Sequence, residues 1–202
     1  MKIAVLGATG MAGSRIVAEA LARGHQVTGI ARKPEGLAAR PGLTTVAADV
    51  AAPGLHELLR GHDAVVSALH FQTLSEPDLA AALKAGGIAR VLIVGGAGSL
   101  EVAPGVQLID TPEFPEVWKP FARPGVAFLA ALRNETELEW TFISPSALFE
   151  PGARTGVFRL GGDQLLVGAD GRSAISGEDF AVALLDELEA PAHVRRRFTV
   201  GY

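Results

Sequence analysis

Residues 2–13 read KIAVLGATGMAG, and this stretch decides the fold. It begins with a short, continuous apolar run, which is typical of a central parallel strand buried on both faces. Gly7 then permits a tight turn, Gly10 lets the backbone approach a pyrophosphate, and Gly13 allows a helix to pack closely on the strand. The unpaired amides at the start of that helix would hold a phosphate without a lysine. We therefore predict a dinucleotide-binding loop formed by Gly7, Ala8, Thr9, Gly10, Met11, Ala12 and Gly13.

The composition excludes several other classes of protein. The chain has 202 residues, 49% of them hydrophobic and 20% charged, which suits one globular domain spanning residues 1–202. A formal net charge of −4 argues against a nucleic-acid partner, and we expect the one basic run, residues 195–197, to be a solvated turn. Cysteine is absent, so disulfides and thiol catalysis are excluded and we expect no metal site. No apolar stretch has the length of a signal peptide or a membrane span, so we expect a cytoplasmic protein with no membrane partner.

Apolar, strand-like segments alternate with helix-like segments along most of the chain. We expect strands at residues 26–30, 43–47, 63–68, 90–94, 140–144 and 197–200, and helices at residues 53–60, 76–85, 126–138 and 178–189. This alternation predicts an α/β fold of Rossmann type, a doubly wound parallel sheet with helices on both faces and a small C-terminal region on the substrate side. Right-handed crossovers place the carboxyl ends of these strands on one rim of the sheet.

Two segments depart from this rhythm. Residues 111–125 contain four prolines among Phe114, Trp118 and Phe121, so they cannot form one regular helix throughout. Such a segment is equally well read as a lid over a flat substrate or as a surface element. Residues 157–171 are rich in glycine and predict a hairpin-like region, after which Ser176 is a good N-cap for the last helix.

The end of the second strand distinguishes NADP from NAD. An acidic residue at this position selects the free 2′-hydroxyl of NAD, but here Arg32 and Lys33 follow the strand. A guanidinium can bind a 2′-phosphate through charge-assisted hydrogen bonds. We therefore expect NADP(H) to be favoured over NAD(H), with two solvated surface cations as the alternative.

Further cofactor contacts are expected where the other strands end. Asp49 and Val50 suit the adenine ring, although Asp49 could also cap the helix that follows it. His70 lies at the edge of the sheet where ligands bind in this type of fold, with a polar loop residue as the alternative. The small residues after the fifth and sixth strands would lie beside the nicotinamide. The expected contacts are Asp49, Val50, Ala68, Leu69, His70, Gly95, Gly96, Ser144 and Pro145.

These features, in this order along the chain, resemble a known family. The glycine spacing, Arg32, the Asp49-Val50 pair, the VVSAL strand, the VGGAGSL strand end and the late WTFISPSALFEPGARTG segment resemble an atypical short-chain dehydrogenase/reductase. The similarity is to the NmrA-like, NAD(P)H-flavin reductase branch related to biliverdin-IXβ reductase, and it covers essentially the whole chain. The resemblance implies a Rossmann-type domain that binds NADP(H) or NAD(H) and transfers hydride to a flavin or another small planar acceptor.

One departure from the wider superfamily bears on the mechanism. Typical members use a Tyr-x-x-x-Lys pair to protonate an alkoxide, whereas this chain has one tyrosine, Tyr202, and no such pair. Flavin reduction needs mainly stacking of the two rings, and solvent can supply the proton. We expect an NADPH-dependent reductase with a flavin as a candidate substrate, and we assign no catalytic residue, because Ser99 lacks its tyrosine partner. The alternatives are a non-catalytic NADP(H)-sensing regulator of NmrA type and an epimerase or dehydratase, against which the missing tyrosine argues.

Overall fold

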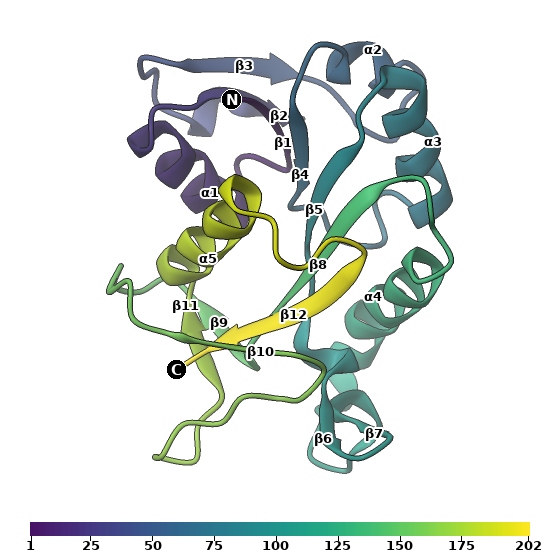
Figure 1. The fold of residues 1–202 in the computed structure, drawn as a ribbon, viewed down its shortest axis with the longest axis vertical. Helices are drawn as coiled ribbons and strands as arrows, with labels where there is room; N and C mark the ends of the chain where they lie inside the picture. Colours follow the sequence, from purple (N-terminus) through teal and green to yellow (C-terminus); the bar gives the residue numbers. More distant parts are fainter.

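Eight strands form one sheet in the computed structural model, which describes residues 1–202 (Figure 1). In chain order they are β1 (Lys2–Leu6), β2 (Gln26–Ala31), β3 (Leu43–Ala47), β4 (Ala64–Ser67), β5 (Arg90–Val94), β8 (Glu139–Pro145), β10 (Arg159–Gly161) and β12 (Arg196–Gly201). The helices are α1 (Met11–Ala22), α2 (Leu55–Leu59), α3 (Glu76–Gly86), α4 (Lys119–Leu132) and α5 (Gly177–Glu189).

Short elements complete the structure outside the main sheet. Two small strand pairs join β6 (Glu101–Ala103) to β7 (Val106–Gln107) and β9 (Leu148–Glu150) to β11 (Ala174–Ser176). Four short 3-10 helices are η1 (Pro34–Gly36), η2 (Ala97–Ser99), η3 (Leu108–Asp110) and η4 (Glu116–Trp118).

The strand order across the sheet is β3-β2-β1-β4-β5-β8-β12-β10. Every neighbouring pair is parallel except the last, in which β10 runs antiparallel to β12 at the edge. The chain winds outward from β1 to β3, returns to the centre and winds the other way from β4, which creates a switch point between β1 and β4. The predicted doubly wound Rossmann-type fold is confirmed.

The sheet has a separate hydrophobic core on each face. Helices α1 and α5 cover one face, and helices α2, α3 and α4 cover the other (Figure 1). Successive side chains of β1 point into the two cores in turn, with Ile3 and Val5 on the α1 side and Ala4 and Leu6 on the α4 side. This arrangement explains the continuous apolar run at the start of the sequence, because a strand covered on both faces has no solvated side.

Helix α4 differs from the helix predicted at residues 126–138. It begins seven residues earlier, at Lys119, and ends at Leu132. Pro120 lies in the first turn, where a missing N–H has no cost, but Pro124 lies inside the helix and cannot donate to the carbonyl of Pro120. The Nε2 of Gln72 donates to that carbonyl at 3.1 Å instead. The prolines therefore permit a helix because a side chain from a distant loop replaces the lost bond.

Three smaller predictions are also wrong. Helix α2 is shorter than residues 53–60, because Gly54, with φ of 97°, precedes it in a left-handed conformation. Residues 157–171 do not pair with each other as a hairpin; β10 pairs with β12 instead. The basic run 195–197 is not wholly solvated, since the side chain of Arg197 is 3% exposed and forms an ion pair with Asp163.

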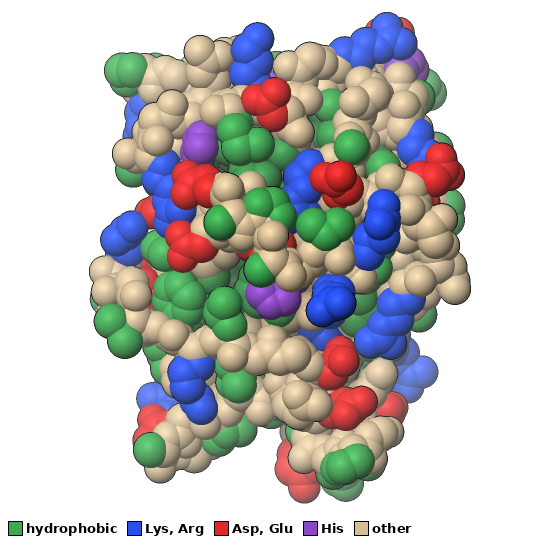
Figure 2. All heavy atoms as spheres, in the orientation of Figure 1, with side chains coloured by type: hydrophobic (Ala, Val, Ile, Leu, Met, Phe, Trp, Pro, Cys, Tyr) green, Lys and Arg blue, Asp and Glu red, His purple; other side chains and the backbone are tan.

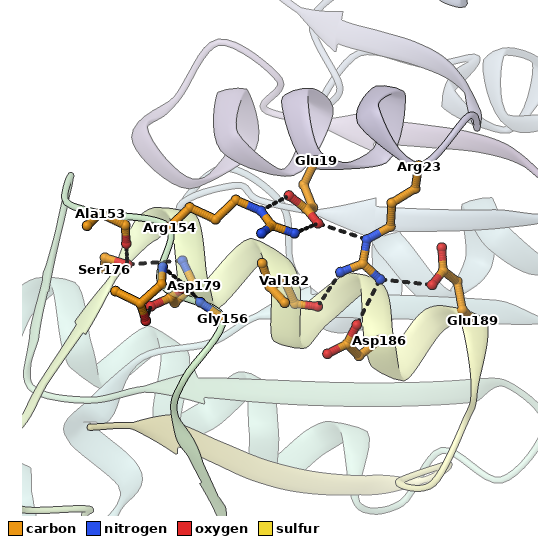
Figure 3. Close-up of polar contacts among 11 residues, drawn as sticks. Glu19, Arg23, Ala153, Arg154, Gly156, Ser176, Asp179, Val182, Asp186 and Glu189 are labelled. Atoms are coloured by element: carbon orange, nitrogen blue, oxygen red, sulfur yellow. Dashed lines mark hydrogen bonds and ion pairs between the residues drawn. The ribbon is translucent and has the colours of Figure 1, made fainter.

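A polar network joins α1 to α5 on one face of the sheet (Figure 3). Glu19, only 7% exposed, accepts hydrogen bonds from Arg154 at 2.8 and 2.9 Å and from Arg23 at 2.8 Å. Arg23 also donates to Asp186 and Glu189 on α5, each at 2.8 Å. The pKa of Glu19 is lowered from 4.5 to about 2, chiefly by the bond from Arg154, while burial acts in the opposite direction and Arg23 adds to the lowering.

This network predicts a pH-dependent contribution to stability. Because the pKa of Glu19 is lower in the folded protein, its carboxylate stabilises the fold above about pH 4.5, and this contribution is lost as the pH falls towards 2. We expect Glu19→Gln to lower the free energy of unfolding at neutral pH by roughly 2 kcal/mol. Urea unfolding across this pH range should show the variant and the original protein converging at low pH. Glu35→Gln is the control, since Glu35 is exposed and unpaired; a Glu19→Gln effect that does not change with pH would contradict the assignment.

No helix of the chain combines the length and the apolar composition that crossing a membrane requires. On the face drawn in Figure 2, acidic and basic side chains are interspersed, and no large basic patch gathers there. The cytoplasmic location and the absence of a nucleic-acid partner stay predictions.

Candidate dinucleotide-binding site

The glycine loop between β1 and α1 is shaped by two close approaches of the backbone, at Gly7 and Gly13. Gly7 has a φ of +77°, and a Cβ there would lie 2.6 Å from the carbonyl oxygen of Ala68. A Cβ on Gly13 would overlap the carbonyl of Gly7. Gly10 differs, because its φ is −70° and a Cβ would meet only the Gly7 carbonyl oxygen, at 3.3 Å. Gly7 and Gly13 are therefore required by packing, whereas Gly10 is exposed and keeps the space in front of the helix open.

The first turn of α1 has free hydrogen-bond donors. The backbone N–H groups of Met11, Ala12 and Gly13 donate to no acceptor in the protein. No side chain caps this helix, and no acidic residue lies in its first turn. Arg15 does not compete for an anion at this position, because its guanidinium is bound to Glu178 and to the Met11 carbonyl. Three free amides, an uncompensated helix dipole and an open glycine fit the pyrophosphate of a dinucleotide.

Arg32 and Lys33 are exposed and follow β2 beside this loop. The amides of Gly7 and Ala8 both donate to the carbonyl of Ile30, at 3.0 and 3.3 Å, which holds the loop against the end of β2. Neither Arg32 nor Lys33 forms a hydrogen bond or an ion pair through its side chain. Their charges are therefore free to meet an anionic group on a ligand that lies along the loop.

Asp49 and Val50 follow β3, where the adenine was expected. The Asp49 carboxylate is exposed and accepts a bond from the Ala51 amide at 3.0 Å, which forms a tight turn. It does not cap α2, whose N-cap is Gly54. Val50 is 6% exposed and packs into the core on the α4 side. The adenine contacts of both residues stay predictions.

A cavity of about 690 Å³ crosses the carboxyl edge of the sheet. Its lining runs from the start of α1 to α4, two helices on opposite faces of the sheet. The cavity brings together residues that the sequence placed at three separate strand ends. They are Gly10, Met11, Ala12, Ala68, Leu69, His70, Gly95 and Gly96.

The remaining expected contacts do not line this cavity. Ser144 and Pro145 are both buried in β8. The Oγ of Ser144 accepts a bond from Arg197 at 3.3 Å, and its carbonyl accepts one from Thr199 at 2.9 Å. Burial lowers the pKa of the Arg197 guanidinium, while the hydrogen bond to Asp163 and the charge of Asp163 act to raise it. Gly7, Ala8, Thr9, Gly13, Arg32, Asp49 and Val50 also lie outside the lining.

The cavity has walls that the sequence did not assign to the cofactor. The aromatic side chains of residues 111–125 form one wall, with Phe114, Trp118 and Phe121 in the lining. The prolines and aromatic residues of that segment were the signal in the sequence. They favoured a lid over the substrate and a surface element equally. A second wall comes from Ala147, Leu148 and Phe149 at strand β9. No pattern in the local sequence predicts this short strand.

Tyr202 is committed to a structural network away from the cavity. Its hydroxyl donates to Asp179 at 2.9 Å and accepts a bond from the Ser176 amide at 3.2 Å. Burial acts to raise the pKa of Asp179, but hydrogen bonds from Thr155, Gly156 and Tyr202 outweigh it and hold the pKa below its usual value. Ser176 caps α5 as predicted, through a bond from the Asp179 amide at 3.0 Å. The one phenol of the chain therefore ties the C-terminus to α5.

The open parallel sheet, its switch point and the free amides beside a glycine loop define a Rossmann-type dinucleotide-binding protein. Residues 7–191 match the family described as NAD(P)H-binding, and the chain belongs to that family.

Known proteins of similar sequence and structure extend over the whole chain. The uncharacterized protein YwnB of Bacillus subtilis is 40% identical, and the match covers 99% of this chain and 98% of YwnB. A candidate epimerase from Bacteroides thetaiotaomicron is 41% identical with a TM-score of 0.95, covering 100% of this chain and 96% of that one. A candidate NADH-flavin reductase from Streptococcus pneumoniae is 36% identical with a TM-score of 0.85, covering 100% and 99%. These findings confirm the expected NAD(P)H-binding family and the expected likeness to NADH-flavin reductases, and they support an NAD(P)H-dependent oxidoreductase with a nicotinamide cofactor.

Proposed function

We propose that this protein is an NADPH-dependent reductase that transfers hydride to a flavin or a similar small planar acceptor. The observation that carries the proposal is the continuity of one cavity from the free amides of α1 to the aromatic wall at Trp118 and Phe121. A dinucleotide held by its pyrophosphate at α1 would extend along the carboxyl edge of the sheet. The nicotinamide would then face a compartment with flat, apolar walls.

The chain's own residues bind and orient the two reactants in this proposal. The amides of Met11, Ala12 and Gly13 hold the pyrophosphate, and Gly96, where a Cβ would meet nothing within 4 Å, leaves room for a ring at the end of β5. When bound, the nicotinamide supplies the hydride. Close stacking of two rings in an apolar cavity supplies proximity, and solvent can supply the proton to a reduced flavin, so no positioned tyrosine is needed.

The preference for NADPH is part of this proposal. It is supported by Arg32, which lies beside the glycine loop with no partner in the protein. A guanidinium without an internal carboxylate partner loses no ion pair when it meets a 2′-phosphate. We expect NADPH to bind more tightly than NADH for this reason.

A second function, cofactor sensing without turnover, is favoured by one observation. The only phenol of the chain is bound to Asp179, and no other group replaces it as a tyrosine-type acid in the cavity. A pocket that binds NADPH and lacks a phenol as the acid suits a regulator as well as a flavin reductase. The missing tyrosine also argues against the epimerase or dehydratase alternative, because no phenol is positioned in the cavity as an acid–base group.

Steady-state oxidation of NADPH separates these functions. We expect loss of reduced-nicotinamide absorbance when riboflavin is added, with a higher kcat/KM for NADPH than for NADH. The same mixture of NADPH and riboflavin without the protein gives the background rate. Tight NADPH binding with no turnover above background, for riboflavin and for a panel of quinones, would contradict the reductase and favour the sensor.

A further inference from the structure

The lining of the cavity contains few ionisable side chains. Two ionisable side chains belong to the lining, His70 and Glu113, and no lysine or arginine does. Lys119, near in sequence, is held by Glu116 through an ion pair of 2.5 Å. A bound anionic group would therefore find no lysine or arginine among the cavity walls.

Glu113 is the one carboxylate of the lining, and it is exposed and unpaired. Its side chain makes no hydrogen bond and no ion pair with any other residue. An uncompensated carboxylate at a cavity wall repels a second anion and leaves a neutral ligand unaffected. Because the group is exposed, screening by water and salt limits this repulsion to a modest effect.

The cavity wall that contains Glu113 also presents two exposed aromatic side chains. Trp118 and Phe121 are 57% and 53% exposed, and their ring centroids lie 6.0 Å apart at an angle of 58°. Large aromatic surfaces are normally buried, so two that remain exposed on one cavity wall offer a stacking surface to a ligand. The only other tryptophan, Trp140, is 2% exposed in the core.

We propose that the cavity selects an uncharged planar ring system, with Glu113 discriminating against acceptors that carry a phosphate or carboxylate and Trp118 stacking on the ring. This inference rests on the proposed function and narrows its substrate class. Riboflavin is an uncharged ligand of this kind, whereas FMN has the same ring and an added phosphate. We therefore expect the cavity to bind FMN less tightly. Both flavins share the stacking contact with Trp118, so the difference between them reports the added phosphate, and the Glu113→Gln variant shows how much of that difference is due to charge.

The test compares the two flavins by calorimetric titration into the full-length protein saturated with NADP⁺. We expect riboflavin to bind roughly three- to tenfold more tightly than FMN, from repulsion by one partly screened carboxylate. Glu113→Gln should remove most of this difference, and Glu113→Lys should reverse it. Asp110→Asn is the matched control, because Asp110 is exposed, lies three residues away and is not part of the lining.

Trp118 is tested separately through its fluorescence. Riboflavin should quench the exposed Trp118 in the original protein, and Trp118→Phe, which retains only buried Trp140, should show little quenching. Trp118→Ala should weaken riboflavin and FMN by the same factor and leave their ratio unchanged.

The outcomes separate this inference from the proposed function. FMN binding as tightly as riboflavin, a ratio that Glu113→Gln does not change, or no binding of either flavin would overturn the inference. If NADPH oxidation nevertheless proceeds with FMN, the reductase stands without the charge selectivity. If the binding ratio is found and no oxidation occurs, the selectivity stands and the reductase fails.

Discussion

Replacing Gly10 by valine is expected to abolish dinucleotide binding while leaving the protein folded. Gly10 is exposed at the start of α1, and its φ of −70° is accessible to any residue. A valine side chain would stand in front of the free amides of Met11, Ala12 and Gly13 and displace the pyrophosphate from them. Losing several charge-assisted hydrogen bonds should weaken NADPH binding by about 100-fold or more.

Two further glycine variants make this test specific. Gly162→Val is the matched control, because a Cβ there meets nothing closer than 3.8 Å and Gly162 lies outside the cavity lining. Gly13→Val should unfold the protein instead, since its Cβ would overlap the Gly7 carbonyl. Calorimetry gives the affinity and circular dichroism the fold. Unchanged NADPH affinity in folded Gly10→Val would show that the amides do not hold the cofactor.

Reversing the charge of Arg32 is expected to change the choice of cofactor. Arg32→Glu replaces an unpaired cation beside the glycine loop with an anion, which repels a 2′-phosphate and can accept a hydrogen bond from a free 2′-hydroxyl. We expect the affinity for NADPH to fall by roughly 100-fold, whereas that for NADH changes by less than about threefold.

Arg60→Glu provides the control for Arg32→Glu. Arg60 is exposed, and its replacement by glutamate changes the net charge by the same amount as Arg32→Glu. It follows α2 at the opposite, amino edge of the sheet. It should leave both affinities unchanged. Equal losses of NADPH and NADH binding in Arg32→Glu would show that Arg32 does not recognise the 2′-phosphate.

The parts of the fold that sequence analysis predicted well are those determined by neighbouring residues. The run from Ile3 to Leu6 and the glycines after it act over a few residues, and they specify strand, turn and helix together. The predicted limits of the strands at 43–47 and 90–94 coincide with β3 and β5. Because parallel strands place their carboxyl ends on one rim, these local patterns were enough to assemble one end of the cavity.

The rest depends on contacts between residues far apart in the chain. Helix α4 continues past Pro124 because Gln72 bonds the carbonyl that the proline leaves free. Arg197 has the sequence context of a surface cation, yet its side chain is only 3% exposed and forms an ion pair with Asp163. Strand β9 exists through pairing with β11, and no three-residue pattern reveals such a partner. The acceptor end of the cavity, built from these distant pieces, could therefore not be derived from local sequence.

The most direct measurement of the central claim is a calorimetric titration of the unmodified protein with NADPH and, separately, with NADH. If the free amides of α1 and the charge of Arg32 hold a dinucleotide, NADPH should bind to one site per chain, more tightly than NADH, and raise the melting temperature. No heat and no rise in melting temperature with either cofactor at millimolar concentration would contradict the account.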